Sequence, residues 1–180
     1  MTVDRALLLY LLSLAEPHGL LSDVKLQQLG FLCELQMFDK RVKGFHLEFV
    51  RYAYGAFSRE LDNDLMSLRR KERIENFSVS EKGAEALAIL LGAADAAEPN
   101  RKILELMQAV IAAHGPEESS AITRSVERVE VSTPDRPEFR LAIEHVSFHS
   151  ILLVPSRIEV DTEFTLPGPA AARLNAALGY

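Results

Sequence analysis

The sequence is poor in the features that mark secreted and membrane-spanning proteins. It has one cysteine, Cys33, which cannot form an internal disulfide and lies in an apolar helical pattern typical of a buried, unreactive thiol. No run of about 18 apolar residues is present, so we expect no membrane span. The first residues lack the basic start of a signal peptide, because Asp4 precedes Arg5 in an apolar segment with helical spacing. These absences favour a cytoplasmic location.

An excess of positive charge is also missing. The formal net charge is −6; residues 1–92 carry 12 basic and 13 acidic side chains, and residues 93–180 carry 8 and 13. Proteins that bind nucleic acid usually show a basic balance or a basic stripe. Two short clusters qualify as a stripe, residues 40–43 and residues 69–73. The second cluster follows a predicted helix, where cations also complement the helix dipole.

The common signatures of catalytic and metal sites are absent. The sequence has no glycine-rich phosphate loop, no HExxH or CxxC pattern and no GxSxG turn. His145 and His149 are four residues apart, which on the strand expected there places them about 13 Å apart, too far to share one ion. A hydrolase would need both histidines and Glu144 to meet in one pocket. We therefore expect no enzyme activity, no cofactor and no metal site.

Residues 1–92 have the element order of a winged-helix module. Apolar residues at helical spacing predict four helices, with starts at Thr2, Ser22, Ser58 and Ser80, residues suited to helix N-caps. Alternating residues 45–54 and the short segment 74–79 predict extended chain. The third helix would take the position of a recognition helix, and residues 74–79 would form an arm of the wing.

The remaining sequence predicts two extensions of this module. Residues 93–123 are expected to be helical after a linker over residues 92–99, and residues 117–128 are expected to form a short helix. Residues 124–180 are expected to form a small three-stranded meander and a short final helix, although Pro137 could equally open a helix. The predicted fold class is therefore α+β: a mostly helical winged-helix-like N-terminal module with a smaller, partly β C-terminal extension.

Three blocks of residues resemble a known bacterial family. The blocks are Lys25-Leu26-Gln27-Gln28-Leu29, then Arg51-Tyr52-Ala53-Tyr54-Gly55-Ala56-Phe57-Ser58-Arg59-Glu60-Leu61 with Asp64-Leu65, and Ser80-Glu81-Lys82-Gly83. They are similar in sequence and spacing to the conserved segments of the Panacea domain and its YwgA-like relatives, over about a third of the chain. The chain departs from the family at Ala56, where proline is usual, and we expect a looser turn there. Gly30 also replaces a bulkier apolar residue.

The resemblance implies a binding function. Panacea-like domains occur in antitoxins of toxin–antitoxin pairs and in adaptors that deliver a toxin to a protease, and they act by binding protein. The implied partner is a toxin or a protease substrate.

Two surfaces follow from these observations. The candidate protein-binding residues combine aromatic and cationic side chains, which are frequent at interface hot spots, with the turn that holds them and the predicted exposed edge of the second helix: Lys25, Gln28, Arg51, Tyr52, Tyr54, Gly55 and Arg59. The tyrosines could instead pack across the second helix, with a hydroxyl reaching a backbone carbonyl. The alternative function is a winged-helix transcriptional regulator that contacts DNA phosphates through four cations, Arg69, Arg70, Lys71 and Arg73. A homodimer is left open.

Overall fold

The computed structural model describes residues 2–19, 21–133 and 135–180, and the protein has an α+β fold dominated by helices. Within the described residues, the α-helices are α1 (Thr2–Ala15), α2 (Asp23–Asp39), α3 (Arg59–Arg70), α4 (Glu81–Asp95), α5 (Glu98–His114), α6 (Ser119–Glu127) and α7 (Gly168–Leu178). Three single-turn 3₁₀ helices accompany them: η1 (Glu16–His18), η2 (Ile143–His145) and η3 (Pro155–Arg157). In the part of the chain that is described, no helix is long and apolar enough to cross a membrane.

The strands are short and form small separate sheets. They are β1 (Val42–Lys43), β2 (Phe49–Tyr52), β3 (Gly55–Phe57), β4 (Ile74–Glu75), β5 (Ser78–Val79), β6 (Glu130–Thr133), β7 (Arg136–Ala142), β8 (Ile151–Leu153) and β9 (Thr162–Glu163). The largest sheet has the order β3-β2-β8 and is antiparallel throughout. β4 and β5 form a hairpin between α3 and α4, at the position expected for a wing.

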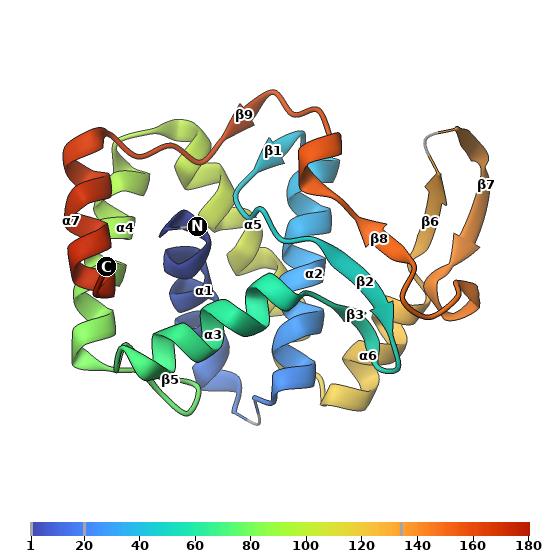
Figure 1. Cartoon of the computed structure of the whole chain (residues 1–180), viewed down its shortest axis with the longest axis horizontal. Helices are drawn as coiled ribbons and strands as arrows, with labels where there is room; N and C mark the ends of the chain where they lie inside the picture. Colours follow the sequence, from blue (N-terminus) through green and yellow to red (C-terminus); the bar gives the residue numbers. More distant parts are fainter. Residues whose placement is uncertain (1, 20, 134) are drawn as a thin grey trace.

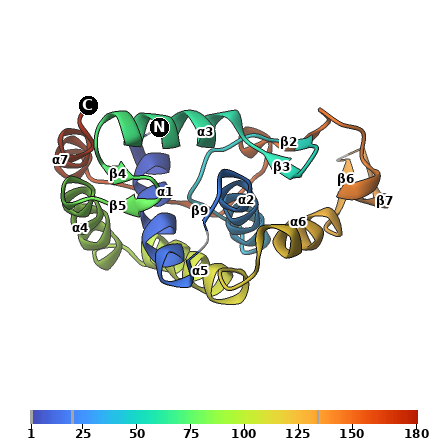
Figure 2. The same ribbon diagram turned by 90° about the horizontal axis from the view of Figure 1, so that it is seen from below.

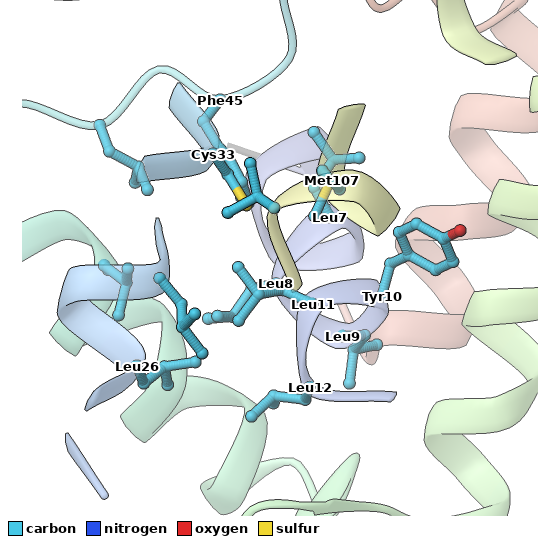
Figure 3. Close-up of a cluster of buried hydrophobic side chains, with 14 of the residues drawn as sticks. Leu7, Leu8, Leu9, Tyr10, Leu11, Leu12, Leu26, Cys33, Phe45 and Met107 are labelled. Atoms are coloured by element: carbon cyan, nitrogen blue, oxygen red, sulfur yellow. The ribbon is translucent and has the colours of Figure 1, made fainter. Parts of the chain in front are cut away.

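The helices are arranged around α1 and α2. Figure 2 shows these two helices between α3 on one side and α5 on the other, and α1 and α2 supply much of the buried apolar core. Figure 3 shows the side chains of α1, from Leu7 to Leu12, pointing in several directions into this core, with Leu26 and Cys33 of α2 and Met107 of α5 nearby. A helix buried on nearly all sides carries apolar residues around its whole circumference, as α1 does.

Local sequence signals account for the helix starts that position the later elements. The hydroxyls of Ser22, Ser58 and Ser80 accept hydrogen bonds from the backbone N–H groups of Lys25, Leu61 and Gly83, as N-caps do. The predicted starts of α2, α3 and α4 are therefore confirmed.

Two predictions for the C-terminal half are wrong. The linker expected over residues 92–99 is mostly helix, because α4 continues to Asp95 and α5 begins at Glu98. The three-stranded meander does not form: β6 and β7 make an isolated hairpin, whereas β8 pairs with β2 and β9 pairs in parallel with β1. The later strands join the N-terminal half because the β1 and β2 edges leave backbone groups that need partners. The predicted final helix is present as α7, which packs on α4 and α1 (Figure 1).

Candidate functional site

The turn between β2 and β3 presents two tyrosines on the surface. Tyr52 is 45% exposed and Tyr54 is 64% exposed. Tyr52 leans on the ring of Phe57, with 5.3 Å between centroids, and its edge meets the ring of His149 at 5.7 Å. Among the described residues, neither tyrosine hydroxyl has a hydrogen-bond partner, so the packing alternative, in which a hydroxyl reaches a backbone carbonyl, is not what the structure shows.

Three adjoining hollows surround these rings, and together with Tyr52 and Tyr54 we call them the tyrosine surface. The central hollow has a volume of about 170 Å³ and is lined mainly by apolar atoms, with Val24 of α2 and both tyrosines on its walls. Tyr52 also borders a second hollow of about 750 Å³ beside the start of α3. Tyr54 borders a third, of about 510 Å³, between α2 and α6. Each tyrosine ring thus separates the central hollow from one of the other two.

Two glutamines of α2 hold β3 in place. The Ala56 N–H donates to Gln28 Oε1 at 3.1 Å, and Gln28 Nε2 donates to the Ala56 carbonyl at 3.0 Å. Gln27 makes the same pair of bonds with Ser58, at 2.8 and 3.0 Å. The backbone N–H and C=O groups of residues 56 and 58 point away from β2. The two side-chain amides therefore take the place that a further strand would occupy.

This arrangement explains two of the sequence blocks and corrects one expectation. Gly55 has a φ of +90°, and a Cβ at this position would lie 2.3 Å from Gln28 Oε1, so glycine is needed on both counts. We expected alanine at position 56 to loosen the turn. The expectation is wrong, because the Ala56 N–H, which a proline would lack, is itself hydrogen-bonded to Gln28.

Arg51 supports the same turn from inside the protein. It is 5% exposed, and its guanidinium donates to the carbonyls of Tyr52 and Gly55. It also forms an ion pair with Glu127 of α6 at 3.2 Å, and it lies over the ring of Phe148. The hairpin therefore packs against both α2 and α6 through β3.

Four of the seven residues predicted to contact a partner are instead internal, and Gly55, buried at the start of β3, is one of them. Lys25 was placed at an exposed edge of α2, but it is 2% exposed and its Nζ donates to the Gly115 carbonyl at 2.7 Å. Burial lowers the pKa of Lys25, although Glu117 acts in the opposite direction. Gln28 and Arg51 are also buried, because the backbone polar groups of the turn need partners and these side chains supply them. Arg59 is exposed and lines one hollow of the tyrosine surface, and Tyr52 and Tyr54 are exposed as predicted.

The cations proposed for DNA contact are largely engaged within the protein. Arg69 pairs with Asp23 at 3.4 Å and lies over the ring of Phe77. Arg73 donates to the carbonyls of Ala177 and Lys71, and the Lys71 ammonium lies over the ring of Tyr180. Of the four, Arg70 alone is exposed without a polar contact among the described residues.

The other groups considered for chemistry do not converge. In residues 2–19, 21–133 and 135–180, no group of three potential metal ligands is present. His145 lies in η2 and His149 has a φ of +65° in the loop before β8, so the strand expected to carry both is absent. Cys33 is buried as predicted, and burial raises the pKa of its thiol well above the usual value.

Helix α2 also carries a buried acid that was not singled out from the sequence. Glu34 on α2 is fully buried; its Oε1 accepts a hydrogen bond from the Leu47 N–H at 3.2 Å, and its Oε2 has no partner among the described residues. Burial raises the pKa of Glu34 well above its usual range, and the hydrogen bond from Leu47 only partly offsets this. No motif marks the residue, because its environment is built by the chain around positions 44–48.

No protein-family model, curated protein or solved structure gives a match to this chain.

The sequence missed several residues that shape the tyrosine surface. They are Asp23, Val24, Gln27, Phe57 and Asp62. Phe57 and Gln27 could have been found from their positions in the sequence. Phe57 lies directly opposite Val50 in the hairpin whose turn was recognised, and Gln27 is next to Gln28 in a recognised block.

Proposed function

We propose that the protein is a non-enzymatic protein-binding module that takes its partner at the tyrosine surface. The observation that carries the proposal is the exposure of Tyr52 and Tyr54 around an apolar hollow, on a hairpin whose backbone is held from both sides. Exposed tyrosines beside a depression are typical of interface hot spots, because a large ring is desolvated at small entropic cost.

The rigidity of the hairpin supports the same function. A surface whose backbone is already ordered before binding loses less conformational entropy when the partner arrives. The four hydrogen bonds from the side-chain amides of Gln27 and Gln28, together with the contacts of Arg51, supply this order. The resemblance of three sequence blocks to the Panacea family adds the class of partner: a toxin or a protease substrate, bound in the bacterial cytoplasm.

The alternative, a DNA-binding regulator, has less support. The β4–β5 hairpin follows α3 as a wing would, but Arg73 donates to two backbone carbonyls, Lys71 lies over the ring of Tyr180, and Arg69 lies over the ring of Phe77 and pairs with Asp23 at the surface. Cations already paired contribute less to the release of counterions that drives binding to phosphates.

Copurification with paired variants tests the proposal. Tagged wild-type protein, the double variant Tyr52→Ala/Tyr54→Ala and the control Phe139→Ala are recovered from the native host at low and moderate salt. Phe139 is 66% exposed on the separate β6–β7 hairpin, so its loss removes an exposed ring elsewhere (Figure 1).

We expect one companion protein in near-equal amount with wild type and Phe139→Ala, and its loss with the double variant. A companion that persists with the double variant contradicts the proposed surface. Recovery of nucleic acid that is released as salt rises, without a companion protein, supports the regulator instead.

A further inference from the structure

The side chains around the tyrosine surface have an excess of negative charge. Five carboxylates line its hollows: Asp23, Glu48, Glu60, Asp62 and Glu127. Arg59 is the cationic side chain that lines them, beside the imidazole of His149. Glu127 is paired with Arg51, and Asp23 is paired with Arg69 at 3.4 Å; the Asp23 side chain is 66% exposed and that of Arg69 37%, so solvent weakens this second pair.

The central hollow combines this charge with an apolar interior. Asp23 and Asp62 both line it, together with the apolar side chains of Val24, Tyr52 and Phe57. Cavities of roughly 150 Å³ accept benzene, so a hollow of about 170 Å³ has room for one large apolar side chain. A cation next to that side chain in a partner would reach the carboxylates at the rim, and a guanidinium or ammonium could also lie against an exposed tyrosine ring.

A partner peptide cannot extend the sheet by pairing with the outer edge of β3. A peptide that extends a sheet needs free N–H and C=O groups along the outer edge of a strand. At β3 these groups belong to Ala56 and Ser58, and both residues are bonded to the glutamine amides. Recognition at the tyrosine surface must therefore depend on the side chains of the partner.

We propose that the tyrosine surface binds a cationic peptide segment of a partner protein, with one large apolar side chain in the central hollow and an adjacent lysine or arginine at Asp23 and Asp62. This assignment rests on the proposed protein-binding function and specifies the chemistry of its partner. Charge complementarity of this kind sets which partner is accepted and accelerates the encounter.

Selection from a phage-displayed library of random peptides tests the assignment. The full chain is the bait, and the double variant Tyr52→Ala/Tyr54→Ala is selected in parallel to remove background sequences. We expect the peptides enriched on wild type to carry lysine or arginine next to an aromatic or large aliphatic residue.

A representative enriched peptide is then measured by fluorescence anisotropy against Asp23→Asn and Asp62→Asn. Each variant should bind about twofold to fivefold more weakly, as expected for partly exposed charge pairs, and the affinity of wild type should fall as salt rises. Glu85→Gln, which removes an exposed carboxylate on the distant helix α4, should leave the affinity unchanged (Figure 2).

The outcomes separate the two proposals. Enrichment of acidic or uncharged peptides, or equal affinity of the asparagine variants, overturns the cationic partner while leaving the tyrosine surface as a protein-binding site. No enrichment over the double variant counts against both.

Discussion

Replacement of Gln28 by alanine tests whether the side-chain amides hold the hairpin. The change removes the two hydrogen bonds between Gln28 and Ala56, whose backbone groups are buried. It leaves the backbone conformation of α2 favourable, because alanine has the highest helix propensity. The loss of stability therefore comes mainly from the contact between helix and strand, with a smaller part from the 3.3 Å hydrogen bond of Gln28 Nε2 to the Val24 carbonyl.

The expected magnitude follows from the groups left behind. Each hydrogen bond contributes about 1 kcal/mol net, and each buried backbone group left without a partner costs about 1–3 kcal/mol. The central hollow adjoins Gln28, so water can reach part of the vacated space and lower the second figure. We expect Gln28→Ala to reduce the free energy of unfolding by about 2–4 kcal/mol.

Urea denaturation monitored by circular dichroism measures this difference. Gln36→Ala is the matched control: Gln36 lies on the same helix, is half-buried, and has no side-chain hydrogen bond among the described residues. Its replacement should change stability by no more than about 0.5 kcal/mol. Equal effects of the two substitutions would refute the role given to the Gln28 amide.

Other substitutions test the buried groups and close backbone contacts. Because the pKa of Glu34 is raised in the folded protein, the folded state retains this proton as pH rises above the usual glutamate value of about 4.3, and stability falls by up to about 1.4 kcal/mol per pH unit until the folded pKa is passed. The free energy of unfolding of Glu34→Gln should therefore rise relative to that of wild type as pH rises, which urea titrations at several pH values measure. A difference in unfolding free energy that does not change with pH would contradict the burial of a titrating acid. Gly83→Ala should destabilise by about 1–3 kcal/mol in thermal melts, because its Cβ would lie 2.1 Å from the Arg73 carbonyl oxygen. Gly92→Ala, with nothing within 4 Å of its Cβ, should stabilise by up to about 1 kcal/mol, and the prediction fails if both changes have the same sign. Cys33 should react with a thiol reagent only at the rate of unfolding, and rapid modification of the native protein would contradict its buried thiol.

The parts of the fold that depend on neighbouring residues could be predicted from the sequence. A helix start is one such feature, since the hydroxyls of Ser22, Ser58 and Ser80 bond backbone groups three residues away. The two exposed tyrosines and the glycine turn between β2 and β3 were also found, because a short turn leaves a local pattern of residues.

The features that depend on distant partners could not be predicted. Lys25 was predicted at the exposed edge of the second helix, but its partner is the Gly115 carbonyl, 90 residues along the chain. Arg51 meets Glu127 across 76 residues in the same way. Strand β8 and its pairing with β2 were not predicted either, because a strand of three residues has too short a pattern to recognise and its partner lies about 100 residues earlier in the chain.

The two glutamine bridges also fix the register of β3. Gly55 and Phe57 direct their backbone groups to β2, whereas Ala56 and Ser58 direct theirs to α2, so a slip by one residue would lose both sets of bonds at once. The hydrogen bonds of β3 to β2 and to α2 must therefore break in the same event. The amide protons of Ala56 and Ser58 should exchange with solvent in a single cooperative opening, and this opening sets how long the tyrosine surface keeps its shape.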